Sequence, residues 1–516
     1  ISMSKTIIII GAGLAGLSAA LQAAENGCNV KLVSSLPSER AQSVMAEGGI
    51  NAALNTKDEN DSPEEHFTDT IKAACGLADP NAVWGMTQAA PELVHWLLKL
   101  GVKFNMSGYD DVDLRNFGGQ KKKRTAFAQS DTGKQIMTAM IDAVRRKEAS
   151  GMVERFSHHS FLTLRLCGNI CCGCVIRDEY SQETVELPGD AVIVATGGMH
   201  GLFGNTTGSL SNTGEVTAEL FRLGVPLANG EMIQYHPTTV KCGGKRMLIS
   251  EAARGEGGRL FAMKDGKQWY FMEEKYPELG NLMPRDITAR EIWKVSHESE
   301  VFLDMTEISE EIISNKLSGL ADDCMTYLHK DIRKEPVSVL PGIHYFMGGI
   351  LVDEQHRTPI QNLYAAGECC AQYHGANRLG GNSLLGALYG GRVAAKSACE
   401  QADVVDLSCA TQIDVPPASQ ISEIKQLNKV MQETMGVVRN ENTLLNGIQT
   451  VQALTGNLPL LGMAVLKSAL ARKESRGAHW REDYPKSNDD DYLKTTVARF
   501  DGKQIQISFV PVPERR

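Results

Sequence analysis

The sequence predicts an α/β fold built around a parallel sheet that binds a dinucleotide. Residues 6–10 are a threonine and four isoleucines, a composition typical of a parallel strand buried on both faces. Glycines spaced G-x-G-x-x-G follow at once, and residues 17–26 continue as a helix, which completes the Rossmann-like strand–turn–helix pattern. Two later apolar stretches, 191–194 and 363–365, also run directly into glycines. We therefore expect these strands to end beside one nucleotide.

The three glycines of the fingerprint have separate expected roles. Gly11 permits a tight turn, Gly13 lets the backbone approach a pyrophosphate, and Gly16 lets the helix pack against the strand. The fingerprint leaves the identity of the dinucleotide open. An acid about twenty residues further on normally holds the ribose, whereas Ser34 and Ser35 occupy the end of the second strand.

Composition excludes several classes of function. The chain has 516 residues, of which 42% are hydrophobic and 22% charged, and its formal net charge is −9. This charge argues against a nucleic-acid surface as the main function, and the basic run at 121–124 is interpreted as a solvated loop. No apolar run approaches the roughly 18 residues of a membrane span, and we find no secretory signal.

Four of the twelve cysteines are clustered at Cys167, Cys171, Cys172 and Cys174. They lie in a strand-like stretch, 163–176, that a Gly-Asn pair interrupts. The pattern predicts a β-hairpin with buried thiols, and a metal site is the alternative. Both interpretations fit a reducing compartment.

The pattern along the chain divides it into three parts. Residues 1–233 and 345–408 form the first domain in two segments, and residues 234–344 form an inserted domain with helices at 286–293 and 309–320. Pro416-Pro417 marks a linker, and residues 409–516 form a C-terminal helical domain and tail. We expect further helices at 64–102 (broken at Pro80-Asn81), from 132, and at 421–431, 441–454 and 459–473.

Five loop segments, punctuated by glycine or proline, concentrate chemically active side chains. They are 234–238, 250–258, 284–286, 344–349 and 374–383, and they bring together three histidines and three arginines. Several cationic donors that converge near a flavin would bind a dicarboxylate.

With these motifs the chain resembles the flavoprotein subunits of the succinate dehydrogenase/fumarate reductase family. The resemblance covers nearly the whole length and includes the opening fingerprint, Ala46-Glu47-Gly48-Gly49, the five loop segments and residues 468–479. It implies a Rossmann-like FAD-binding domain, an inserted α+β capping domain that moves, and a C-terminal helical domain.

The resemblance also implies the residues that hold FAD. They are Gly11, Ala12, Gly13, Leu14, Ala15, Gly16, Ser34, Gln42, Ser43, Glu47, Gly48, Gly49, Ala195, Thr196, Gly197, Glu215, Glu368, Arg378, Asn382, Ser383, Leu384 and Leu385.

For the reaction, the resemblance implies that the flavin gives a hydride to one alkene carbon of fumarate while Arg285 protonates the other. Glu251 and Arg254 would relay protons to Arg285. The substrate would be held by Phe117, His236, Ser250, His344 and Arg378.

Two positions depart from the family pattern. Gln42 stands where many relatives carry a histidine bonded to FAD, so non-covalent FAD is implied. Since the covalent bond assists succinate oxidation in this family, its absence favours fumarate reduction. Glu215 follows Thr213-Gly214 where the family has aspartate.

Three alternatives remain at this point. L-Aspartate oxidase shares the fold, but it places a glutamate where this chain has Phe117, and Leu379-Gly380-Gly381 also favours the dicarboxylate branch. A reductase of another fumarate-like alkene acid is the second, and a non-catalytic flavin-binding scaffold is the third.

The sequence contains neither the C-x-x-C-x-x-C pattern of an iron–sulfur centre nor a haem C-x-x-C-H. Electrons therefore arrive through a partner subunit or directly from a soluble donor. Residues 468–479 resemble subunits that dock an iron–sulfur protein, which favours the partner. We expect a cytoplasmic protein, peripheral on the inner face of the membrane through partner subunits.

Overall fold

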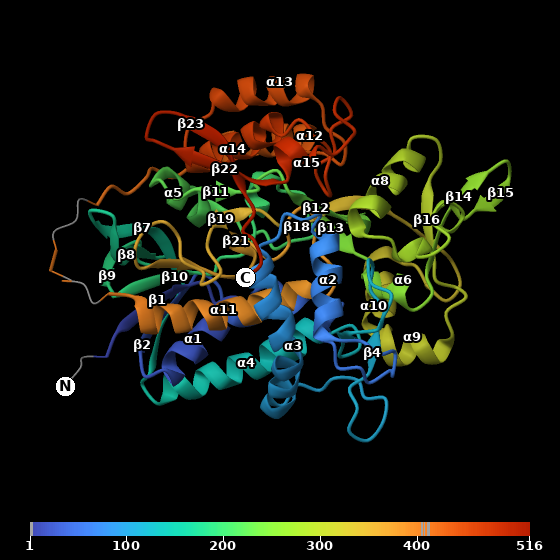
Figure 1. The fold of residues 1–516 in the computed structure, drawn as a ribbon, viewed down its shortest axis with the longest axis horizontal. Coiled ribbons are helices and arrows are strands. Elements are labelled where there is room, and N and C mark those ends of the chain that lie inside the picture. The colour runs from blue at the N-terminus through green and yellow to red at the C-terminus, as the bar shows by residue number, and fades with distance from the viewer. Residues whose placement is uncertain (1–3, 404–405, 407, 410–412) are drawn as a thin grey trace.

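The computed structural model describes residues 4–403, 406, 408–409 and 413–516. A five-stranded parallel sheet, in the order β20-β10-β1-β2-β6, forms its centre (Figure 1). The strands are β1 (Thr6–Ile10), β2 (Asn29–Ser34), β6 (Val153–Ser157), β10 (Ala191–Val194) and β20 (Leu363–Ala365). The predicted parallel sheet is confirmed, and its three glycine-ended strands are neighbours.

The run of isoleucines in β1 is buried on both faces because side chains alternate along a strand. Ile7 and Ile9 face a core made with four helices, whereas Ile8 and Ile10 face a core made with a second sheet. The helices are α1 (Leu14–Glu25), α3 (Pro80–Leu100), α4 (Thr132–Ala149) and α11 (Asn382–Gln401). The second sheet consists of β7 (His159–Cys167), β8 (Ile170–Asp178) and β9 (Thr184–Pro188).

Smaller elements complete this part of the chain. They are β3 (Ile50–Asn51), β4 (Leu114–Arg115), β5 (Thr125–Ala126), α2 (Pro63–Ala73) and α5 (Glu215–Arg222). The helical run expected at 64–102 is divided into α2 and α3, as predicted. The break covers residues 74–79, and Pro80 and Asn81, where it was expected, are the first two residues of α3.

The inserted segment has its own core, at the right of Figure 1. A four-stranded antiparallel sheet contains β15 (Lys267–Trp269), β14 (Arg259–Lys264), β16 (Val301–Asp304) and β17 (Val337–Ser338). Its helices are α6 (Glu251–Gly255), α7 (Phe271–Lys275), α8 (Arg285–Ser296), α9 (Glu310–Lys316) and α10 (Ser318–Asp323). The helix expected at 309–320 is thus two helices. The boundaries at 234 and 344 stay predictions.

A three-stranded antiparallel sheet joins the inserted segment to the first domain. It contains β13 (Lys245–Leu248), β12 (Ile233–Cys242) and β18 (Leu340–Phe346). Since β12 enters the inserted segment and β18 leaves it, their pairing brings the two ends of the segment together.

The C-terminal part, at the top of Figure 1, contains the expected helices. They are α12 (Ile421–Thr434), α13 (Glu441–Gln452) and α14 (Asn457–Ala471), followed by the short α15 (Asp489–Tyr492). Two strands that the sequence analysis did not anticipate follow, β22 (Lys494–Phe500) and β23 (Ile505–Pro511). They extend a sheet with β11 (Leu227–Ala228), β19 (Gly349–Leu351) and β21 (Cys370–Ala371).

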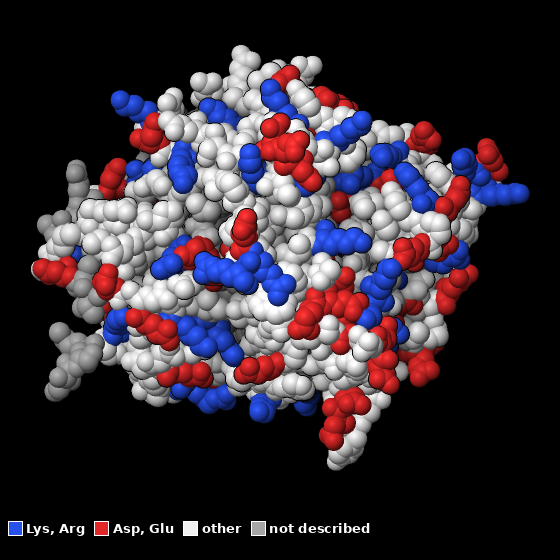
Figure 2. Space-filling model, viewed as in Figure 1, with Lys and Arg blue, Asp and Glu red and all other residues white. Residues whose placement is uncertain are grey.

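Acidic and basic side chains are interspersed on the face shown in Figure 2. Within the described residues, no helix combines the length and the apolar character needed to cross a membrane.

Candidate functional site

A cavity of ≈ 1090 Å³ extends from the glycine fingerprint to the inserted segment. The strands β1, β10 and β20 end at its wall, where Gly11, Ala195 and Ala366 line it. This is the position beyond the carboxyl ends of parallel strands at which open α/β sheets bind ligands.

The fingerprint glycines are required by close backbone contacts. Gly11 has φ +110°, and a Cβ there would lie 2.0 Å from the carbonyl oxygen of Ala195. A Cβ on Gly16 would lie 1.8 Å from the carbonyl oxygen of Gly11, so the helix start and the turn are in contact. Gly13 is the N-cap of α1 and has no side chain to cover the helix start. The N–H of Leu14 donates to the hydroxyl of Ser43 at 3.1 Å, so an anion would approach this helix start beside Ser43.

Most residues predicted to hold the cofactor line this cavity. The set comprises Gly11, Ala12, Gly13, Leu14, Ala15, Ser34, Gln42, Ser43, Glu47, Gly48, Gly49, Ala195, Thr196, Gly197, Glu215, Glu368, Arg378, Ser383 and Leu384. The hydroxyl of Ser34 and Oε2 of Glu47 are buried without a hydrogen-bond partner in the protein. A glycine cradle with unpaired polar atoms at its edge fits a dinucleotide cofactor.

Three predicted cofactor residues lie outside the wall. Gly16 is behind the turn, and Leu385 is buried in the helical core. The side chain of Asn382 is occupied inside the protein, where its amide donates to Thr70 and its oxygen accepts from Asn51. The assignment of these three residues to the cofactor stays a prediction, and in the structure they lie behind the cavity wall.

Burial, together with the nearby carboxyls of Asp323 and Asp131, raises the pKa of Glu47 to about 8. Glu368, predicted to hold the cofactor, accepts the backbone N–H of Phe346 at 3.1 Å through Oε1. The same oxygen lies 3.5 Å from Nε2 of His200, a residue that the sequence analysis did not single out.

At the other end of the cavity, Arg285 is the first residue of α8. Its Nη1 donates to Oε1 of Gln234 at 3.1 Å, and its Nη2 donates to Oε2 of Glu251 at 3.1 Å. The other oxygen of Glu251 accepts from Nη2 of Arg254 at 3.4 Å. The structure thus connects Arg254, Glu251 and Arg285 in one buried chain, as the family resemblance implied.

Positive charge exceeds negative charge here. Arg378 also lines the cavity and lies over the ring of Tyr345, and no described carboxylate is within 4.0 Å of its guanidinium. Burial lowers the pKa of Arg378 to about 9 and that of Arg254 to about 10. Burial would raise the pKa of Glu251, but the guanidinium groups of Arg285 and Arg254 outweigh it and hold the pKa below its ordinary value.

His236 has a defined tautomer. The backbone N–H of Thr238 donates to Nδ1 of His236 at 3.2 Å, so the proton of the neutral ring is on Nε2. Nε2 is buried and has no hydrogen-bond partner in the protein. Burial, with Arg285 nearby, holds the pKa of His236 well below its ordinary value, so the ring is a neutral donor.

The remaining predicted substrate residues lie around the same end of the cavity. His344 packs edge-on against His236, and its Nδ1 bonds to the hydroxyl of Thr207 at 2.6 Å. Ser250 caps α6 by accepting the N–H of Ala252, which leaves its hydroxyl hydrogen to donate. The ring of Phe117 fills the space beside Gly48, where a Cβ would be 2.5 Å from it.

The sequence analysis assigned no role to Gln234 and did not consider Thr207. Gln234 lies in a motif that was noted, and it joins Arg285 to the backbone oxygen of Arg378, to which its amide donates at 2.8 Å. Thr207 lies in a polar loop whose sequence gave no signal, because only the fold brings it to His344.

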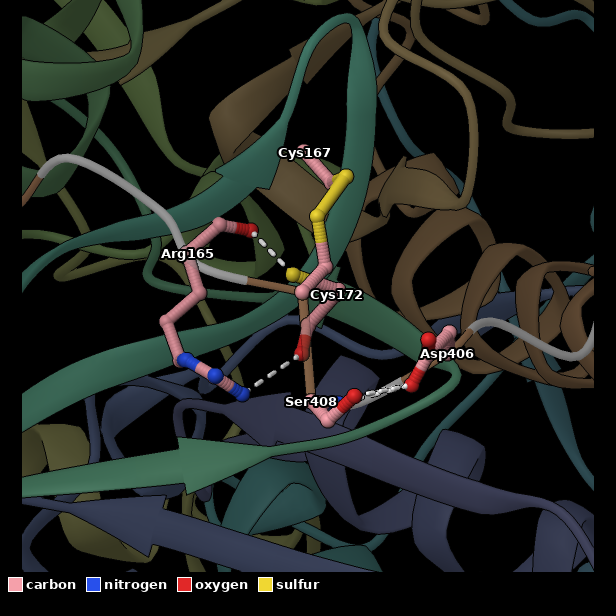
Figure 3. Close-up of a disulfide and its surroundings, with 6 residues drawn as sticks. Arg165, Cys167, Cys172, Asp406 and Ser408 are labelled. Atoms are coloured by element: carbon pink, nitrogen blue, oxygen red, sulfur yellow. Dashed lines mark hydrogen bonds between the residues drawn. A yellow bond between two sulfur atoms is a disulfide. The ribbon is translucent and has the colours of Figure 1, made fainter.

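The prediction of free thiols is wrong for Cys167, which forms a disulfide with Cys409 (Figure 3). Cys171, Cys172 and Cys174 are buried free thiols in the predicted hairpin. No group of three metal-ligating side chains occurs among the described residues. The disulfide joins residues separated by 242 positions, so local cysteine spacing could not reveal it.

Several charged or polar side chains of the motif at 468–479 are buried. Arg472 is fully buried and pairs with Glu231 and Glu474 at 2.7 and 2.9 Å. Arg476 pairs with Glu474 at 2.8 Å, and His479 is fully buried. These side chains stabilise the C-terminal part, whereas Lys473 in the same motif is exposed, and a docking role for the motif stays a prediction.

Comparison with known proteins finds related families, sequences and structures over nearly the whole chain. The chain matches the family described as "FAD binding domain" over residues 6–384 and that described as "Fumarate reductase flavoprotein C-term" over residues 454–515. It is 38% identical to the succinate dehydrogenase flavoprotein subunit of Bacillus subtilis, over 99% of this chain and 98% of that protein. It is 32% identical to the 8-methylmenaquinol:fumarate reductase flavoprotein subunit of Wolinella succinogenes, over 99% of this chain and 92% of that one. The solved flavoprotein of a mutant E. coli quinol fumarate reductase superposes with a TM-score of 0.88 at 27% identity, covering 99% and 97% of the two chains.

Proposed function

Because the chain belongs to the family of succinate dehydrogenase and fumarate reductase flavoprotein subunits, we propose that it interconverts fumarate and succinate and favours fumarate reduction. It is a FAD-dependent oxidoreductase of this family. When bound, FAD supplies hydride exchange with the substrate at the N5 atom of the flavin. The chain itself has to bind two carboxylates, exclude water and move one proton.

The observation that carries this proposal is the position of Arg285. Two of its nitrogens are bonded, to Gln234 and Glu251, while its Nε is buried in the cavity region without a partner. We assign Arg285 as the donor of the proton to the second alkene carbon. Glu251, between the guanidinium groups of Arg285 and Arg254, passes the replacement proton.

Four further groups are assigned to the substrate carboxylates. His236 offers its Nε2–H, Ser250 its hydroxyl hydrogen, His344 its ring and Arg378 its guanidinium. A dicarboxylate would bring two negative charges to a site that has more buried cations than anions. These preplaced donors would also stabilise charge that develops on the substrate during reduction.

Gln42 supports non-covalent FAD, because a glutamine amide cannot form the imidazole bond of the flavinylated relatives. The proposed preference for fumarate reduction rests on the same residue. Phe117 argues against L-aspartate oxidase, since its ring offers no negative charge to a substrate ammonium group.

The proposed electron partner is an iron–sulfur subunit. Two relatives are named as flavoprotein subunits, one of a succinate dehydrogenase and one of an 8-methylmenaquinol:fumarate reductase. Because a subunit has partners, these names support a partner subunit for this chain. Through such partners the protein would lie at the cytoplasmic face of the membrane.

Dye-linked assays in both directions test the function. Fumarate reduction by reduced viologen should be faster than succinate oxidation by phenazine methosulfate at equal enzyme concentration. Absence of both activities in protein that carries FAD would overturn the proposal, and hydrogen peroxide made from aspartate would move the protein to the oxidase branch.

A further inference from the structure

Two free cysteines lie in contact at the far end of the FAD-binding domain from the substrate site. Cys28 follows α1, and Cys399 is near the end of α11. Their sulfur atoms are 2.8 Å apart and share a hydrogen bond. A disulfide bond is about 2.05 Å long, so bond formation requires the sulfurs to move by less than about 1 Å.

The pair lies where α1 has ended and near the end of α11, and these two helices also form the cofactor cavity. The first turn of each helix contributes to its wall, through Leu14 in α1 and Ser383 in α11. Between the cavity and the cysteines the helices are in direct contact, because Ser18 donates to the backbone oxygen of Leu388 at 2.6 Å. Figure 1 shows α1 and α11 next to each other under the central sheet. A covalent bond at the cysteines would therefore restrain the position of α1 relative to α11, and with it the part of the cavity wall that the two helices form.

The surroundings of the pair favour thiol chemistry. The ammonium group of Lys5 donates to the backbone oxygen of Cys399 at 2.8 Å. The hydrogen bond between the two sulfurs lowers the pKa of the Cys28 thiol and raises that of the Cys399 thiol, so the pair shares one proton that can pass between the sulfurs. The charge of Lys5 lowers both pKa values. Cys399 is half-buried, whereas Cys28 is only 6% exposed, so a reagent in solution meets Cys399 first.

We propose that Cys28 and Cys399 are a redox-modification site at which a reversible disulfide joins the turn after α1 to the last turns of α11. The oxidant is a low-molecular-weight disulfide such as oxidised glutathione. The thiol of Cys399 passes its proton to the sulfur of Cys28 across their hydrogen bond, and the Cys399 thiolate so formed attacks the glutathione disulfide. This gives a mixed disulfide and releases one glutathione thiolate, which takes the proton from Cys28. The thiolate of Cys28 then attacks the sulfur of Cys399 and releases the second glutathione. Two cysteine thiols are oxidised, one glutathione disulfide is reduced to two thiols, and the protons of the cysteines pass to the leaving thiolates.

Peptide mapping of the FAD-loaded protein tests this proposal. The protein is incubated with oxidised glutathione, its remaining thiols are blocked with N-ethylmaleimide, and its peptides are analysed by mass spectrometry. We expect a Cys28–Cys399 cross-linked peptide that dithiothreitol removes. The cross-linked protein should also melt a few degrees higher, because the bond closes a long loop in the unfolded chain.

Two single variants separate the steps. Cys28→Ser should stop at a glutathione adduct on Cys399, and Cys399→Ser should leave Cys28 unmodified because it is buried. Cys167→Ser, which removes the other disulfide, should leave the Cys28–Cys399 cross-link unchanged. A wild-type protein that keeps both thiols free, or that ends with glutathione on Cys399 and no cross-link, would overturn the proposal.

Discussion

Arg285 and Glu251 face each other across the cavity wall, with Nη2 of the arginine 3.1 Å from Oε2 of the carboxylate. Both are buried, and the second oxygen of Glu251 contacts Arg254 at 3.4 Å. One carboxylate thus forms ion pairs with two guanidinium groups. This arrangement keeps Glu251 ionised and leaves a net positive charge for the substrate.

Arg285→Ala should lower kcat for fumarate reduction at least about a thousandfold, about 4 kcal/mol of transition-state stabilisation. The reason is that its proton is transferred in the transition state, while other residues still bind fumarate. Arg285→Lys should restore little, since lysine is shorter and lacks the planar fork. Turnover with reduced viologen and fumarate affinity from flavin absorbance measure the two effects.

Arg333→Ala is the matched control, because Arg333 lies exposed in the same inserted segment and pairs with Glu310 at 2.7 Å. It should keep wild-type kcat. If Arg285→Ala retained more than about a tenth of wild-type kcat, a loss of only about 1.4 kcal/mol, the proton donor would be another residue.

Fumarate binding should depend on pH through Arg378 and not through the histidines. Burial holds the pKa of His236 and of His344 well below the ordinary value, so neither titrates between about pH 6 and about pH 8. The pKa of Arg378 is lowered to about 9, so the KM for fumarate should be constant to about pH 8 and rise above pH 9 as this cation is lost. A KM that rises through the range of an ordinary histidine would contradict the assignment.

Glu47→Gln should stabilise the protein increasingly as the pH rises from about 5 to 8. The folded-state pKa of Glu47 is about 8, above the 4.5 of the free group, so the unfolded chain releases this proton first and the wild type loses stability across that window. Melting temperatures of the two proteins should therefore agree near pH 4 and separate up to pH 8. Glu183→Gln, at an exposed position, is the control and should show no such trend.

FAD should be released in full when the protein is precipitated with acid, because Gln42 provides no imidazole for a covalent bond. The absorbance of the supernatant and of the washed pellet measures this. Yellow colour that stays with the pellet would mean that another side chain forms the bond.

Much of the fold was predictable from the sequence. Four consecutive isoleucines before a glycine fingerprint can be accommodated only where both faces of a strand are covered, and Gly11 and Gly16 leave no room for a Cβ. Such local patterns depend on neighbouring residues. The strands β22 and β23 were missed because β22 pairs with β11, where Ala498 lies opposite Leu227 in a register that no local pattern encodes.

The sequence by itself determined the nucleotide-binding turn, the buried strands and the set of residue types around the substrate, because these follow from glycine geometry, side-chain periodicity and motif spacing. Only the tertiary structure decided how those residues act together. It placed Gln234 between Arg285 and Arg378, brought Thr207 to His344, bonded the side chain of Asn382 to Thr70 and joined Cys167 to Cys409. The physical reason is that hydrogen bonds and disulfides act over a few ångströms, and folding alone sets which distant residues come that close.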